Sequence, residues 1–161
     1  MTEEGLLDRS RCEIETRSAR LTDLKKVINL DAQITSLSKP TYWQDTFDRF
    51  VGRNGRYFVV AENRSGGSQV LPFIGFIVGE IRAWEFGSQP CGWILTILVS
   101  PKYQGRGVGE TLFRAICSGM KNDGVVTVRT MTARDDNLNM SFFRAQGMMA
   151  GPFIELEKSL N

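Results

Sequence analysis

The sequence contains no histidine. Imidazole is the base of Ser-His-Asp and Cys-His nucleophilic systems and the commonest transition-metal ligand in proteins. This absence argues against a hydrolase triad and against typical zinc catalysis, so we expect no metal cofactor. Any group that accepts a proton must be a carboxylate, a tyrosine, a lysine, a thiol or water.

Cysteine is scarce as well. Cys12, Cys91 and Cys117 are widely spaced, odd in number and without a CxxC pair. A disulfide framework or a zinc cluster needs paired or closely spaced cysteines. The pattern predicts reduced and mostly buried thiols.

The chain also lacks a long apolar run and an excess of charge of one sign. Its first residues, MTEEGLLDRSRCE, resemble neither a signal peptide nor a membrane span. With 20 basic and 18 acidic residues and no dense Lys/Arg run, there is no electrostatic case for nucleic acid or a membrane surface as partner. At 161 residues and 42% hydrophobic content, we expect a single cytoplasmic domain over residues 1–161, with residues 1–11 flexible.

The most informative stretch runs from Ile94 to Met120. An apolar run ends at Val99 and is followed by three alternating glycines, Gly105, Gly107 and Gly109, which open a helical pattern. Glycines allow tight turns and expose backbone amides, and a helix N-terminus favours negative charge. This strand, loop and helix therefore predict a phosphate cradle.

Periodicity elsewhere predicts a mixed sheet. Strands are expected at 13–17, 57–62, 70–84, 93–99, 125–132 and 153–157, and helices at 24–34, 42–51, 108–120 and 137–145. This order is typical of an α/β (α+β) fold with a mixed, largely antiparallel sheet of six to seven strands and helices on both faces. The strands at 93–99 and 125–132 should be parallel, because a helix crosses between them. The aromatic face of the helix at 42–51 is either core or the border of a substrate groove beside the TSLSKP loop.

The glycine loop does not match the common nucleotide-binding motifs. GRGVGE lacks the GxGxxG spacing of dinucleotide folds, and the Lys-Ser/Thr ending of a Walker loop is absent. The wider pattern is V-x-P-x-x-Q-G-x-G-x-G, which begins at Val99 and ends at Gly109. It resembles motif A of the GNAT superfamily of N-acetyltransferases. The element order agrees over nearly the whole chain, and FFRAQGM resembles the family's F-Y-x-x-x-G-F segment.

This resemblance implies acetyl-CoA as co-substrate. In the family, amides of the loop bind the pyrophosphate, and the strand before it splays from its neighbour and pairs with pantetheine. Carried over to this chain, the strand residues are Ile97, Leu98 and Val99, and the loop residues are Gln104, Gly105, Arg106, Gly107, Val108 and Gly109. Arg106 or Lys102 could neutralise phosphate charge, or each could be a solvated surface residue. Asn137 could hydrogen-bond pantetheine, although helix capping by Asp135, Asp136 or Asn137 explains that segment equally well.

The implied reaction is direct attack of a primary amine on the thioester in a ternary complex. It needs a base, an oxyanion donor and an acid for the leaving thiolate. We take the amide of Val99 as oxyanion donor and Glu80 as base, with Glu85 or a water chain as alternatives. The position of the family's tyrosine acid holds Phe143, which cannot donate a proton.

Two functions therefore follow from the resemblance. The first is an acetyl-CoA-dependent N-acetyltransferase that acts on a small molecule, a protein N-terminus or a lysine. The second is a catalytically weak acyl-CoA-binding or regulatory module, motivated by Phe143 and by the absence from ILTILV of the glutamate that many family members have on this strand. A homodimer is expected only because dimers are common in the family.

Overall fold

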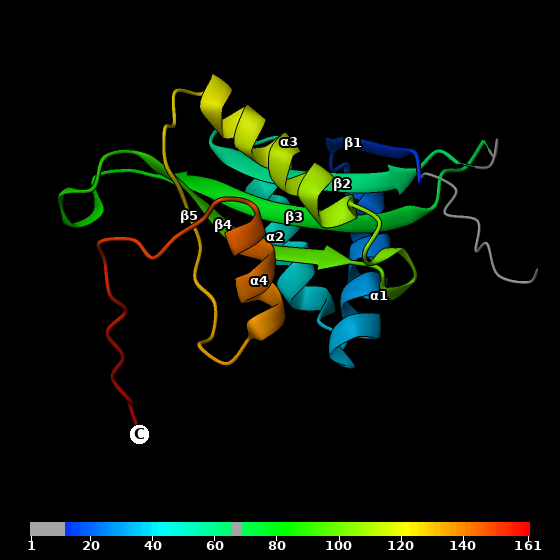
Figure 1. The fold of residues 1–161 in the computed structure, drawn as a ribbon. Coiled ribbons are helices and arrows are strands. Elements are labelled where there is room, and N and C mark those ends of the chain that lie inside the picture. The colour runs from blue at the N-terminus through cyan, green and yellow to red at the C-terminus, as the bar shows by residue number, and fades with distance from the viewer. Residues whose placement is uncertain (1–11, 66–68) are drawn as a thin grey trace, which may run out of the picture.

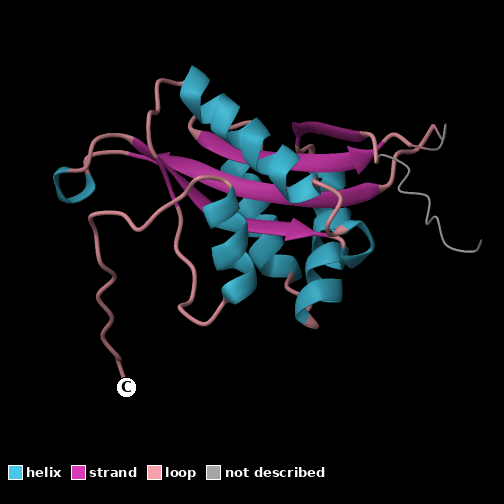
Figure 2. Ribbon diagram, in the orientation of Figure 1, coloured by secondary structure: helices cyan, strands magenta, loops and turns pink. Residues whose placement is uncertain are grey.

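A computed structural model describes residues 12–65 and 69–161. The flexible segment predicted at 1–11 lies outside this range. Within it, one sheet has the order β1-β2-β3-β4-β5 (Figures 1 and 2). The first four strands are antiparallel neighbours and β4 and β5 are parallel, as the crossover predicted. The strands are β1 (Ile14–Ser18), β2 (Arg56–Asn63), β3 (Phe73–Arg82), β4 (Cys91–Val99) and β5 (Val128–Arg129).

Two helices, α1 (Leu24–Thr35) and α2 (Pro40–Phe50), cover one face of the sheet. α2 begins with Pro40, whose missing N–H is not needed in a first helical turn. Trp43, Phe47 and Phe50 of its aromatic face are buried, and Trp43 packs edge-on against Phe76 of β3 with ring centroids 5.2 Å apart. This aromatic cluster fixes α2 against β2 and β3.

The opposite face carries α3 (Val108–Asn122) and α4 (Asn137–Ala145), which lie in front of the sheet in Figure 1. α3 buries a stripe at helical spacing that includes Leu112, Ile116 and Met120. It lies so close to β3 that a Cβ at Gly79 would stand 2.9 Å from Met120 Cε. The prediction of helices on both faces of a mixed sheet is confirmed.

The predicted number of six to seven strands is wrong, because the described sheet has five. The strand expected at 153–157 is absent: after Phe153, whose ring centre lies 4.6 Å from Arg129 Cζ, the segment extends away from the body, and Leu156 is exposed (Figure 1). The sheet ends at β5, whose two residues offer too short an edge for another strand to pair along. The strand expected at 125–132 is reduced to Val128–Arg129, and the one expected at 70–84 begins only after Pro72.

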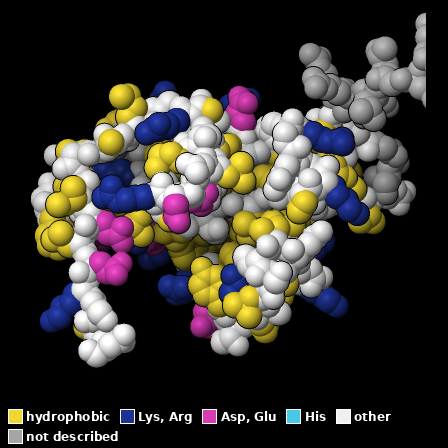
Figure 3. Space-filling model, turned by 60° about the horizontal axis from the view of Figure 1, so that its bottom comes forward, with side chains coloured by type: hydrophobic (Ala, Val, Ile, Leu, Met, Phe, Trp, Pro, Cys, Tyr) yellow, Lys and Arg dark blue, Asp and Glu magenta, His cyan; other side chains and the backbone are white. Residues whose placement is uncertain are grey.

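Three short 3₁₀ turns complete the described elements: η1 (Leu21–Asp23), η2 (Glu85–Gly87) and η3 (Pro101–Tyr103). Among the described residues, no helix is long and apolar enough to cross a bilayer. On the face drawn in Figure 3, basic and acidic side chains are interspersed, in keeping with the balanced composition.

Cys12, Cys91 and Cys117 are free thiols, and burial raises the pKa of Cys12 and Cys117.

Candidate active site

The parallel pair β4–β5 separates almost as soon as it forms. Only Gly92 and Trp93 of β4 pair with β5, and the last link is a hydrogen bond from Thr130 Oγ1 to the Ile94 carbonyl at 3.0 Å. Beyond this point, β4 has β3 as its single partner strand in the described sheet. The edge of β4 that carries Ile97, Leu98 and Val99 is therefore open on the β5 side, where an extended ligand can pair with its backbone.

A β-bulge lies where the strands part. Val78 of β3 is opposite Thr96, but the next residue, Gly79, is opposite Ile94, so Leu95 is the extra residue of β4. Both Leu95 and Thr96 line a cavity on the α1–α2 side of the sheet. Bulges re-aim side chains next to functional sites. Here the two residues of β4 that line the cavity directly precede Ile97, where the open edge of the strand begins.

The glycine loop follows β4 directly and ends at α3. Gly105 and Gly107 have φ of 72° and 83°, and, in the described part of the chain and apart from the adjoining residues, no heavy atom lies within 4 Å of a Cβ built on either. Gly107 is the N-cap of α3 and has no side chain to satisfy the first helical amides. The first amide to bond back into the helix is that of Thr111, at 3.0 Å from the Gly107 carbonyl. The amides before it point out of the helix end, in the arrangement that binds phosphate.

Gly109 has a different reason to be glycine. It lies inside α3, and a Cβ there would stand 3.0 Å from Cε2 of Phe142. It therefore lets α4 approach the first turn of α3. The guanidinium of Arg106 lies 5.8 Å from the centre of the Tyr103 ring, and Lys102 is exposed on the same loop.

α4 carries no proton donor at the position expected for one. Phe143 is buried and packs edge-on against Phe113, with ring centroids 6.1 Å apart. The capping alternative holds for Asp136, which is the N-cap of α4 and accepts from the Asn139 amide at 3.1 Å. Asn137 follows as the first helical residue and is exposed, and its contact with pantetheine stays a prediction.

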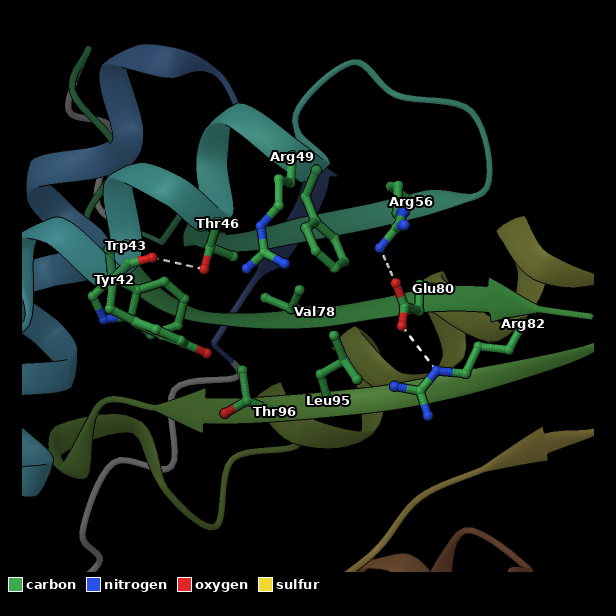
Figure 4. A pocket seen from close by; sticks show the side chains of 11 residues that line it. Tyr42, Trp43, Thr46, Arg49, Arg56, Val78, Glu80, Arg82, Leu95 and Thr96 are labelled. Carbon is green, nitrogen blue, oxygen red and sulfur yellow. Dashed lines mark hydrogen bonds and ion pairs between the residues drawn. The ribbon is translucent and has the colours of Figure 1, made fainter. Parts of the chain in front are cut away.

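The cavity on the α1–α2 side has a volume of about 370 Å³ (Figure 4). It lies between α2, β2, β3 and the bulge of β4. Its polar lining comprises two hydroxyl-bearing threonines, one tyrosine, one carboxylate and three guanidinium groups: Tyr42, Thr46, Arg49, Arg56, Glu80, Arg82 and Thr96. The aromatic face of α2 is thus both core and cavity wall, since Trp43 is buried while the Tyr42 ring is half exposed.

Glu80, the predicted base, lies in this cavity. Its Oε1 accepts from Arg82 Nε at 2.9 Å, and its Oε2 pairs with Nη1 of Arg56 (Figure 4). The alternative base, Glu85, lines a second cavity of about 260 Å³ beside the β3–β4 hairpin, which shares Arg82 with the first. Each carboxylate is open to a cavity, and only that of Glu80 lies in the one that reaches the β4 bulge.

The sequence analysis did not single out the three arginines of the cavity. Arg49, Arg56 and Arg82 come from α2, β2 and β3 and meet only in the folded chain. A signal was present, because Tyr42, Thr46 and Arg49 are spaced along one helix face. Likewise, Glu80 and Arg82 are two residues apart on one strand and therefore point to the same face of the sheet. Among the described residues there is no group of three or more acidic or cysteine side chains that could hold a metal ion.

A comparison with protein-family models identifies the chain. The model of the acetyltransferase (GNAT) family matches residues 24–148, from the start of α1 to just past α4. The chain belongs to the GNAT family. The resemblance drawn from the glycine loop is thereby confirmed.

Solved structures share this GNAT fold at low sequence identity. The aminoglycoside N-acetyltransferase AAC(6')-Iy in complex with CoA aligns over 100% of both chains, with 17% identity and a TM-score of 0.77. The aminoglycoside 6'-N-acetyltransferase AAC(6')-Ih from Acinetobacter baumannii aligns over 92% of this chain and 99% of its own, with 15% identity and a TM-score of 0.74. A transcriptional regulator from Bacillus halodurans C-125 aligns over 91% and 99%, with 15% identity and a TM-score of 0.72. No curated protein matches the chain significantly in sequence.

Proposed function

We propose that this protein transfers the acetyl group of acetyl-CoA to a primary amine. The observation that carries the proposal is the early separation of β4 from β5 beside the glycine loop at the start of α3. It provides an open strand edge and a set of outward-pointing amides in direct succession along the chain. Family membership and a structural neighbour solved with CoA support the same donor.

The residues present fit acetyl-CoA. The open space around Gly105 and Gly107 admits a pyrophosphate, which the amides of the loop and of Val108 would hold. The backbone of Ile97, Leu98 and Val99 would bind pantetheine along the open edge of β4. When bound, acetyl-CoA supplies an activated thioester.

The remaining residues would hold and deprotonate the amine. The cavity meets β4 at Leu95 and Thr96, so an amine bound there reaches the open edge from the α1–α2 side. Attack forms the amide C–N bond and breaks the C–S bond, and the ammonium must first lose a proton. We assign the proton acceptor to Glu80, the one carboxylate among the described residues that line this cavity, and the oxyanion donor to the amide of Val99.

The second candidate function is an acyl-CoA-binding or regulatory module with weak activity. It is motivated by Phe143, which has no hydroxyl group and cannot act as the acid. A thiolate is a tolerable leaving group, so water can protonate it and the reaction does not require a tyrosine. The deciding experiment combines calorimetry of acetyl-CoA binding with detection of free CoA thiol over a panel of amines. Acceptor-dependent thiol release supports the transferase. Binding without release by any amine supports the module, and no binding refutes both.

A further inference from the structure

The charge of the 370 Å³ cavity that contains Glu80 gives information about the acceptor. Of the residues that the structure describes, three arginines and a single carboxylate line it, so this lining carries two more positive than negative charges (Figure 4). The chain as a whole has a formal net charge of only +2. The positive charge is therefore concentrated where the acceptor would bind.

Two of the three arginines already have partners. Arg56 and Arg82 flank Glu80 and pair with its two oxygens. Each also stacks on an aromatic ring: Arg56 Cζ lies 5.1 Å from the centre of Phe50, and Arg82 Cζ lies 4.9 Å from the centre of Trp93. These contacts hold the two guanidinium groups in place and balance the negative charge of the Glu80 carboxylate.

Arg49 also lies over an aromatic ring, with its Cζ 6.0 Å from the centre of Phe50, but it differs from these two arginines in its polar contacts. Its Nε donates to the Asp45 carbonyl one turn earlier at 3.3 Å, and in the described part of the chain no carboxylate lies within 4.0 Å of its nitrogens. Its side chain extends from α2 into the cavity (Figure 4). Both terminal nitrogens are thus available to a ligand. A guanidinium presents them as a planar fork that matches a carboxylate.

From this arrangement, and resting on the acetyl transfer proposed above, we infer that the acceptor is a small amine that also carries a carboxylate. Arg49 binds the carboxylate, and the hydroxyls of Tyr42 and Thr96 line the same cavity and can donate to it. The amine then lies toward Glu80 and the bulge of β4. A volume of about 370 Å³ is at the small end of ligand sites, which suits a molecule the size of a free amino acid.

This acceptor class differs from that named for the structural neighbours. Aminoglycosides carry several ammonium groups at neutral pH, and an unpaired guanidinium in the cavity opposes their binding. At 15–17% identity, the likeness to those enzymes concerns the fold alone.

Matched pairs of amines test the inference. Each pair consists of an amino acid and the amine left when its carboxylate is removed, such as phenylalanine with phenethylamine and leucine with isoamylamine. Binding is measured by calorimetry on the protein saturated with CoA, and turnover is measured by thiol release with acetyl-CoA. We expect the carboxylate-bearing member to bind at least tenfold more tightly. Equal or tighter binding of the plain amine overturns the inference, as does binding of neither member.

Arg49→Gln should weaken binding of the amino acid by about 10- to 100-fold and leave the plain amine unchanged. Arg49→Lys should restore part of the loss, because it keeps the charge without the planar fork. Arg53→Gln is the matched control: Arg53 is exposed in the turn after α2 and lies outside the cavity lining, so this variant should behave like the wild type. An equal effect of Arg49→Gln and Arg53→Gln overturns the assignment.

The calorimetric binding of the amines and the release of CoA thiol together separate this inference from the proposed function. Arg49-dependent binding of amino acids without thiol release supports carboxylate recognition and refutes acetyl transfer. Thiol release with plain amines, or with a peptide whose carboxylates are blocked, in preference to amino acids supports acetyl transfer and refutes carboxylate recognition.

Discussion

The indole Nε1 of Trp43 donates to Oδ2 of Asp31 at 2.7 Å, and this hydrogen bond joins α2 to α1 beneath the cavity. Both side chains are 2% exposed, so water cannot replace the contact. Lys39 adds an ion pair to the same carboxylate at 2.9 Å. The pair holds in place the helix that carries Tyr42 and Arg49.

Trp43→Phe should therefore lower the free energy of unfolding by about 1.5–3 kcal/mol, because it removes a buried hydrogen bond to a charged group and leaves Oδ2 of Asp31 with the Lys39 ammonium as its remaining side-chain partner. The measurement is urea denaturation of the wild type, Trp43→Phe, Asp31→Asn and the double variant. A double-mutant cycle should show coupling of about 1 kcal/mol or more. Strictly additive effects of the two substitutions would contradict the assigned role of the hydrogen bond.

Gly107→Ala should weaken acetyl-CoA binding by about tenfold or more in calorimetry. A non-glycine residue at a φ of 83° is strained by about 1–2 kcal/mol, and the added methyl group projects into the space assigned to the pyrophosphate. Gly124→Ala is the control, since Gly124 follows the other end of α3 with a φ of 85° and the same open surroundings. It should cost similar stability and leave acetyl-CoA affinity intact. Equal affinities in the two variants would remove the loop from the binding site.

How far the sequence predicts this molecule depends on how local each feature is. The strand, loop and helix that begin at Ile94 were predicted correctly, because β-branched residues, proline and alternating glycines act on their immediate neighbours. The extended segment at 153–157 has an alternating pattern but no strand to pair with, and no local signal reports that absence. The arginines of the cavity were missed for a related reason, because Arg49 lies on α2 and Arg82 on β3, and they come together only when the helix packs on the sheet.

Glu80→Gln distinguishes a base from a structural partner of the arginines. If Glu80 accepts the proton of the ammonium, kcat should fall by about 100-fold or more and the acidic limb of the pH–rate profile should flatten, with acetyl-CoA affinity unchanged. Glu85→Gln, made in the neighbouring cavity, tests the alternative base under the same conditions. A change confined to the KM of the acceptor would instead show that Glu80 only positions Arg56 and Arg82.

Tyr57 gives the fold a distinct response to alkaline pH. Its hydroxyl donates to Oδ2 of Asp123 at the end of α3 and so links β2 to that helix. Burial, followed by this hydrogen bond and the negative charge of Asp123, raises the pKa of Tyr57 to about 12. An unperturbed tyrosine has a pKa of about 10. Between these two values the unfolded chain loses the proton while the folded chain retains it.

The free energy of unfolding should therefore fall as the pH rises from about 10 to about 12, whereas below pH 10 the contribution of Tyr57 is fully present. Urea denaturation at a series of pH values measures this. The stability advantage of the wild type over Tyr57→Phe should be constant up to about pH 10 and shrink above it. Absorbance of tyrosinate should show one late step in the folded wild type that is missing in Tyr57→Phe. Stability curves that stay parallel through this range would mean that the Tyr57–Asp123 link does not hold the proton, and α3 would then be anchored at this end by packing alone.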